Sequence, residues 1–280
     1  MEGFVTGDRA AGARDGAPAE PPLFHGVEAR PDCPYCNGTA QAIDSEAIVD
    51  AIYCISLQEQ PHRTAQAAEL FHRHGLCRGV MFFRPTRPRG RDASWGVWDS
   101  HRRVARHALA EGHKRVLIFE DDVQLARPWS RIVRRVERAY PELPGEWWGL
   151  FLGHFPMQAY FVTPRLARVR SVCAHAYIAN APLLRWLGET TPQDPDVEVS
   201  RVVGRAMDGA FAALPEMYAL FPLVATQRAM GDGRPLGYRD LLILYGARPA
   251  EAIAALFSPL HWLIMEIARV RAAGREIRSV

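Results

Sequence analysis

The sequence predicts an α/β fold, a mostly parallel sheet flanked by helices, on three observations. The chain has 280 residues, 48% of them apolar, which is enough to build one large domain or two small ones. An unbroken apolar run at 116–119 leads directly into Glu120, Asp121 and Asp122, as expected of a strand covered on both faces. From residue 51 to residue 140, segments with the period of strands alternate with segments of helical period.

The composition argues against several classes of protein. A net charge of +3 without a concentrated basic stripe gives no reason to expect nucleic acid as a partner. No leader-like apolar segment opens the chain and no run of about 18 apolar residues occurs, so we expect a cytoplasmic protein without spanning helices. The five cysteines are odd in number, so a disulfide framework is not expected. Cys33 and Cys36 are interpreted as reduced thiols, with a zinc site as the alternative.

The first segments set the domain boundaries. Residues 1–45 are rich in Gly, Ala, Pro and Asp and have no periodic apolar face, which predicts a disordered tail before a domain at 46–235. Residues 51–57 predict the first strand. The helix that follows runs to about Arg73, and Gly75 lies just past its end. Its buried face is predicted to comprise Ala67, Leu70 and Phe71.

A second strand is expected at 79–83, and the loop 84–91 after it carries four arginines. The loop is interpreted either as solvated or as a contact for a phosphate or an anionic acceptor. The next helix opens near Gly96 and ends at Gly112. His101 falls on its inward stripe, where by period alone it is a core histidine. The other members of this stripe are Val97, Val104, Ala105, Ala108 and Leu109.

Pro128 suits the first turn of a helix that follows the acids. Further strands are expected at 147–153, 159–163, 175–179 and 217–224, with a helix at 182–187. Residues 236–280 predict a helical extension with an apolar stripe and an arginine-rich end. This extension either packs on the domain or makes peripheral contact with a membrane surface. The helix at Pro128 is predicted to bury Trp129, Ile132, Val133, Val136 and Tyr140.

The three acids at 120–122 indicate a binding site. Ligands of open α/β sheets bind outside the carboxyl ends of the strands, where these side chains fall. Adjacent carboxylates beside a buried strand repel one another and lose hydration unless a cation lies among them. Oxygen ligands favour Mg²⁺, Mn²⁺ or Ca²⁺ over Zn²⁺. The simpler alternative is an acidic turn that caps the next helix.

Five motifs in order, over roughly residues 51–227, resemble glycosyltransferase family 25, the lipopolysaccharide-type β-galactosyltransferases and their collagen-modifying relatives. Ser56 and Gln60 depart from the family pattern, which has Asn and Arg at these positions. The matching positions are Ile55 to Leu57 with Arg63; Gly96, Ser100 and His101; Glu120 to Asp122; Trp147 or Trp148 with Leu152 and Gly153; and His175 to Tyr177 with Asp208 and Pro222 to Gln227.

The resemblance implies a single Rossmann-like domain of the GT-A type. It implies inverting transfer of galactose or a related hexose from a nucleotide-diphosphate sugar, a UDP-sugar by preference, to a hydroxyl of a glycan or another acceptor, as in lipopolysaccharide biosynthesis. A divalent metal, Mn²⁺ or Mg²⁺, would bind the donor's diphosphate through Glu120 and Asp122. The nucleotide-sugar site would comprise Leu57, Arg63, Ser100, His101 and Asp121.

Asp208 is the expected general base, because it is a lone carboxylate in a small, apolar stretch. The structural alternative is an N-cap for a helix beginning at Gly209. His175 is the second catalytic residue expected, and Glu216 follows it as a substitute base. Two other functions stay open: a catalytically silent relative that binds sugar or nucleotide, and a metal-dependent phosphohydrolase.

Overall fold

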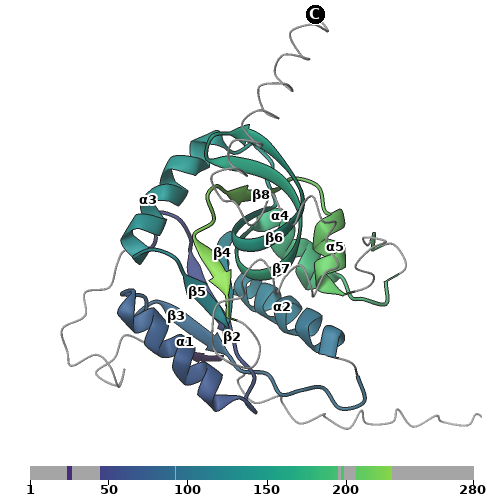
Figure 1. Ribbon diagram of the computed structural model, residues 1–280. Coiled ribbons are helices and arrows are strands. Elements are labelled where there is room, and N and C mark those ends of the chain that lie inside the picture. Colours follow the sequence, from purple (N-terminus) through teal and green to yellow (C-terminus); the bar gives the residue numbers. More distant parts are fainter. Residues whose placement is uncertain (1–23, 27–44, 92, 195–196, 199–205, 229–280) are drawn as a thin grey trace, which may run out of the picture.

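The computed structural model describes residues 24–26, 45–91, 93–194, 197–198 and 206–228 (Figure 1). Their central feature is a sheet of seven strands in the order β1-β3-β2-β4-β7-β6-β8. The strands are β1 (Phe24–Gly26), β2 (Ala51–Ile55), β3 (Val80–Phe83), β4 (Arg115–Glu120), β6 (Gly149–Thr163), β7 (Leu166–Asn180) and β8 (Met217–Leu220). A second sheet pairs β5 (Val123–Leu125) with β9 (Ala225–Gln227).

The sheet is parallel where the site is built and mixed beyond it. Strands β3, β2 and β4 are mutually parallel. Strand β7 joins β4 antiparallel and pairs with β6 as a long hairpin, while β8 adds parallel to β6. The predicted α/β class, with a central sheet flanked by helices, is confirmed and is consistent with a GT-A-like arrangement.

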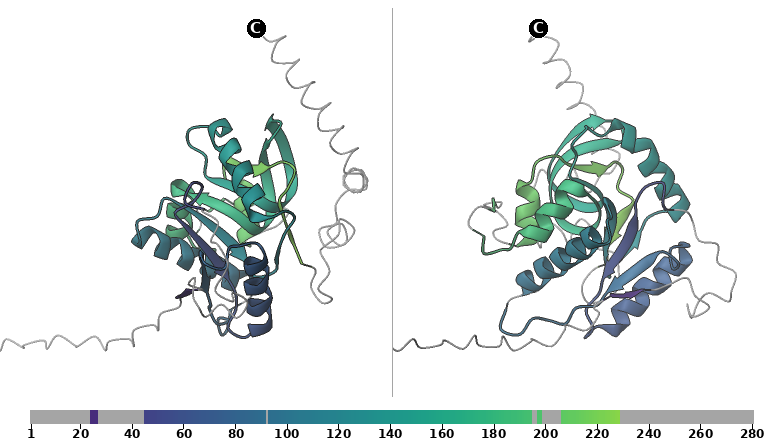
Figure 2. Two further views of the ribbon diagram at one scale, coloured as in Figure 1. Left: turned by 90° about the vertical axis from the view of Figure 1, so that its left-hand side faces the viewer. Right: turned by 180° about the vertical axis from the view of Figure 1, so that it is seen from behind.

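Helices cover both faces of the sheet. Helices α1 (Pro61–Arg73) and α3 (Trp129–Ala139) lie on one side, and α2 (Ala93–Ala110), α4 (Ala181–Glu189) and α5 (Met207–Ala213) on the other (Figures 1 and 2). A short 3₁₀ turn, η1 (Tyr140–Glu142), follows α3. The sheet therefore separates two hydrophobic cores.

Strand β4 contributes side chains to both cores. Side chains alternate between the faces of a strand. Leu117 and Phe119 join the core under α1 and α3, whereas Val116 and Ile118 join the core under α2, α4 and α5. All four are fully buried, as the unbroken apolar run predicted, and each contributes about 1.5–3 kcal/mol by its burial.

The predicted helix faces hold with one exception. Ala67, Leu70 and Phe71 are buried in α1, which Pro61 opens at its first turn. Val97 was expected on the inward stripe of α2, but 43% of it is exposed. The reason is that α2 begins at Ala93, and Val97 lies in its first turns over a cavity rather than over the sheet.

Three strands expected at 147–153, 159–163 and 175–179 are parts of one hairpin. Strands β6 and β7 each span 15 residues, and register shifts interrupt their pairing, including one beside Gly153. Such bulges break the alternation of polar and apolar residues, so the sequence pattern reads as separate short strands. The strand expected at 217–224 is shorter in the structure, where β8 ends at Leu220 and β9 begins only at Ala225.

The edge strand β1 corrects the expected N-terminal tail. Phe24 to Gly26 pair antiparallel with β3, so part of the segment 1–45 belongs to the sheet. Cys33, Cys36 and the extension 236–280 lie outside the described residues. Within the described residues, no helix combines the length and apolar character needed to cross a membrane.

Candidate functional site

The site forms where the parallel strands β2 and β4 end side by side. Ile55 pairs with Glu120, so the residues after each strand face a shared edge of the sheet. A cavity of about 350 Å³ opens at this edge. Its lining comes from the ends of β2 and β4, the start of α1, the arginine-rich loop and the first turns of α2.

The cavity brings together seven of the nine predicted site residues: Leu57, Arg63, Ser100, His101, Glu120, Asp121 and Asp122. Asp208 and His175 are not among its lining residues. The sequence motifs around 57, 100 and 120 are thus adjacent in space, although they come from three different strand–helix units.

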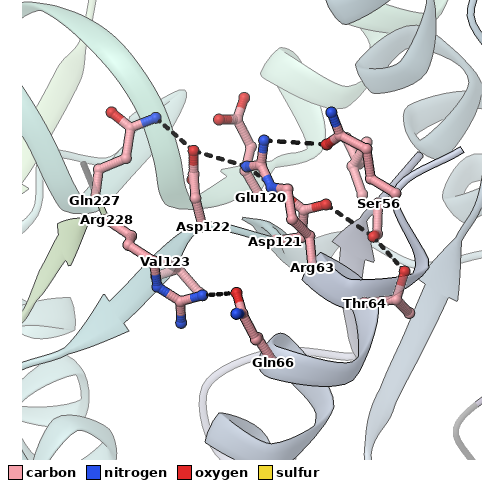
Figure 3. A network of polar contacts seen from close by, with 12 residues as sticks. Ser56, Arg63, Thr64, Gln66, Glu120, Asp121, Asp122, Val123, Gln227 and Arg228 are labelled. Carbon is pink, nitrogen blue, oxygen red and sulfur yellow. Dashed lines mark hydrogen bonds and ion pairs between the residues drawn. The ribbon is translucent and has the colours of Figure 1, made fainter. Parts of the chain in front are cut away.

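Arg63 lies between Asp121 and Asp122 (Figure 3). Its guanidinium forms a short ion pair with Asp121 Oδ1 and a second one, 2.9 Å long, with Asp122 Oδ2. The Ser56 hydroxyl donates to Asp121 Oδ2 over 2.8 Å. A hydroxyl has one proton, so Thr64, 2.7 Å away, donates to Ser56 in turn. Ser56 stands where the pattern of the resembled family has Asn. In this structure it holds the Asp121 carboxylate by a hydrogen bond.

Asp122 is held from the opposite side by β9. Gln227 donates its amide N–H to Asp122 Oδ2 over 2.9 Å, and the Arg228 backbone N–H donates to the Asp122 carbonyl. Asp122 Oδ1 is buried and makes no hydrogen bond with the described residues. One oxygen of this carboxylate is consequently fixed and the other is free.

The divalent metal expected among these acids does not fit the observed arrangement. Both oxygens of Asp121 and one oxygen of Asp122 are already engaged by Arg63, Ser56 and Gln227. In the part of the chain that the structure describes, no three Asp, Glu, His or Cys side chains are grouped to hold a metal ion. The cation that the adjacent carboxylates require is the Arg63 guanidinium.

Glu120 belongs to a separate chain of hydrogen bonds. His101 Nε2 lies 3.3 Å from Glu120 Oε1, and His101 Nδ1 lies 2.7 Å from the Tyr177 hydroxyl. Burial lowers the pKa of His101 to about 4, so the ring is neutral near pH 7. Burial and then the neighbouring Asp122 carboxylate raise the pKa of Glu120 well above its usual range. Glu120 is thereby oriented at the cavity wall with a quarter of its side chain exposed.

Asp208 is placed differently from both expectations. It lies within α5, whose N-cap is Ala206, so it does not cap a helix beginning at Gly209. Its carboxylate accepts hydrogen bonds from the backbone N–H groups of Cys173 and Ala174, and Cys173 has a positive φ of 60°. Burial nevertheless raises the pKa of Asp208. Asp208 therefore supports an irregular position within β7 near His101, and it is not among the residues that line the cavity.

His175 is a packing residue in this arrangement. It is buried at 4% exposure, and burial lowers its pKa to about 4. A Cβ on Gly153 would come within 2.4 Å of His175 Nε2 and 2.7 Å of the Ala225 carbonyl oxygen. The motif residues Gly153 and His175 therefore occur together because the imidazole fills the space that glycine leaves.

Basic side chains line the same cavity as the acids. Arg87 and Arg91 line the cavity from the loop after β3, and Arg91 lies over the Trp95 ring at 5.1 Å. Glu59 accepts the backbone N–H of Arg87 and so fixes the loop. The arginine cluster was visible in the sequence, but its position in the same cavity as Glu120 was not. Gln227 was noticed only as part of a motif, and its contact with Asp122 depends on the pairing of β5 with β9.

Comparisons with known proteins find distant structural neighbours and no match in sequence. No family model matches the chain, and no curated protein matches its sequence. Among solved structures, it is similar to A197 from STIV, with 10% identity, a TM-score of 0.37, and coverage of 63% of this chain and 84% of that one. It is also similar to a glycosyltransferase involved in the glycosylation of the major capsid of PBCV-1, with 9% identity, a TM-score of 0.30, and coverage of 49% and 63%. Both TM-scores are too low to carry an argument about function.

Proposed function

We propose that this chain is a glycosyltransferase that binds a nucleotide-diphosphate sugar, a UDP-sugar by preference, in the cavity at the ends of β2 and β4. The observation that supports the proposal is the lining of the cavity, which holds Arg87 and Arg91 together with the carboxylates at 120–122. Guanidinium groups bind phosphate oxygens, and carboxylates accept hydrogen bonds from sugar hydroxyls. The cavity volume of about 350 Å³ is in the range of small-molecule sites.

The reaction proposed is direct displacement at the sugar's anomeric carbon. An acceptor hydroxyl forms the new C–O bond as the bond to the diphosphate breaks, and its proton passes to a base. Glu120 is the proposed base because it lines the cavity and His101 orients it, whereas Asp208 is not among the lining residues. Arginines near the leaving diphosphate would stabilise the charge that develops there.

The second candidate is a binding module without turnover. The ion pairs of Arg63 with Asp121 and Asp122 favour it, because they engage acids that the family resemblance assigns to the donor. Glu120→Gln separates the two candidates once an acceptor is known. Loss of a general base lowers turnover by roughly a hundredfold or more while nucleotide affinity stays unchanged.

A panel of nucleoside diphosphates and nucleotide sugars, each with and without Mn²⁺, tests the proposal by thermal stabilisation. A ligand at about 100 times its dissociation constant stabilises the folded state by about 2.7 kcal/mol. We expect at least one nucleotide sugar to raise the melting temperature more than its free sugar does. No shift with any member of the panel would contradict the proposal.

A further inference from the structure

The guanidinium of Arg63 occupies the place where a metal would be expected in the acid cluster Glu120 to Asp122. It contacts one oxygen from each of Asp121 and Asp122, whose side chains are 7% and 12% exposed. Two carboxylates this close to each other and this far from water need a positive charge between them. Arg63 supplies that charge from a different element, the first turn of α1.

Neighbouring side chains hold Arg63 and the two acids in this contact. Gln60 accepts a hydrogen bond from Arg63 Nη1 over 3.2 Å, so both ends of the guanidinium are engaged. Ser56 fixes the second oxygen of Asp121, and Gln227 donates to the same Asp122 oxygen that Arg63 contacts. Burial raises the pKa of Asp121, and the Arg63 charge is the largest influence that opposes this rise.

Two oxygen positions stay free while Arg63 is in place. One is Asp122 Oδ1, which is buried without a hydrogen-bond partner among the described residues. The other is Glu120 Oε2, because among the described residues only Oε1 of that carboxylate has a partner, His101. A Mg²⁺ or Mn²⁺ ion needs about six oxygen ligands, and two carboxylate oxygens without phosphates hold it poorly.

We propose that Arg63 is the resident cation of this cluster and excludes a divalent metal from it as long as its two ion pairs persist. Arg63 is 28% exposed and begins a helix, so its side chain can leave the acids without any strand moving. Removing its charge leaves the Asp121 and Asp122 carboxylates without the cation between them, an arrangement that attracts a divalent cation. The inference concerns the acids themselves and holds whether or not the cavity accepts a nucleotide sugar.

Titration of the full chain with Mn²⁺ alone, followed by the paramagnetic resonance signal of free Mn²⁺, tests this. We expect the parent to bind no Mn²⁺ at sub-millimolar concentration, and Arg63→Met to bind at least about tenfold more tightly than the parent. Arg73→Met is the matched control, because Arg73 lies on the same helix in an exposed pair with Glu69. The control should behave as the parent does.

Equal Mn²⁺ affinity in the parent and in Arg63→Met would overturn the proposal, and so would tight binding by the parent. If Arg63→Met does not fold, Arg63→Lys replaces it. Lysine keeps one charge but lacks the second nitrogen by which Arg63 is held to Gln60, so its charge is less well fixed between the two acids and intermediate affinity is expected. If Arg63→Lys bound Mn²⁺ with the same affinity as the parent, this would also count against a specific role for the guanidinium.

Discussion

At the scale of single residues, burial of histidines controls the response to acid. His154 and His175 are buried, and burial lowers their pKa values to about 3 and about 4. A histidine whose folded pKa lies below its ordinary value of about 6.5 binds fewer protons in the folded state than in the unfolded state. Its stabilising contribution is therefore present above pH 6.5 and is lost as the pH falls toward the folded value.

His154 allows this contribution to be isolated. Its Nδ1 lies 2.6 Å from the Ser171 hydroxyl, which an asparagine amide can still reach. We expect His154→Asn to flatten the pH dependence of stability between pH 6 and pH 5 by about 1.4 kcal/mol per unit. Urea unfolding of parent and variant at several pH values measures the slopes. Parallel curves would show that His154 is not neutral in the folded protein.

At Gly153, even the addition of a single methyl group should destabilise the protein. A Cβ there would overlap His175 and the Ala225 carbonyl, so Gly153→Ala should cost about 1–3 kcal/mol of stability by overpacking. Gly145→Ala is the control, because nothing lies within 4 Å of the added carbon. Chemical unfolding of both variants checks the difference. Equal stability would mean that β6 and β9 are not packed as described.

At the scale of elements, helix α3 allows the effect of apolar packing on stability to be compared with the effect of surface charge. Its inner face buries Trp129, Ile132 and Val136 against the sheet, and its outer face exposes arginines, including Arg134. Ile132→Ala should cost about 2–5 kcal/mol, because it removes buried methyl groups and leaves a cavity. Arg134→Ala should stay within about 0.5 kcal/mol of the parent. Similar losses in both variants would contradict the assignment of the inner face.

Elements were predictable where periodicity is undisturbed. The apolar run of β4 and the stripe of α3 follow directly from side-chain alternation and helical spacing. The hairpin of β6 and β7 could not be predicted, because its register shifts hide the alternation. The role of Arg63 was hidden for another reason. Carboxylates in sequence require a cation, but no local pattern says whether a metal or a distant side chain provides it.

At the scale of the whole molecule, two helical layers and a sheet leave one edge open at the ends of β2 and β4. Seven of the predicted site residues line the cavity at this edge because the parallel strands end together. Asp208 and His175 lie outside that lining, where Asp208 accepts hydrogen bonds from the backbone of β7 and His175 packs against Gly153 of β6. Their catalytic roles stay predictions, and the motifs indicated the region of the fold in which these residues lie.

The central claim is that this cavity binds the nucleotide-diphosphate donor. Calorimetric titration of UDP into the parent, Val97→Trp and Val162→Trp tests it most directly. Val97 is exposed at the cavity wall, whereas Val162 is exposed on the β6–β7 hairpin, so only the first tryptophan fills the cavity. We expect the parent and Val162→Trp to bind alike, and Val97→Trp to bind at least about tenfold more weakly with an unchanged melting temperature. Undiminished binding by Val97→Trp, or no binding by the parent, would contradict the claim.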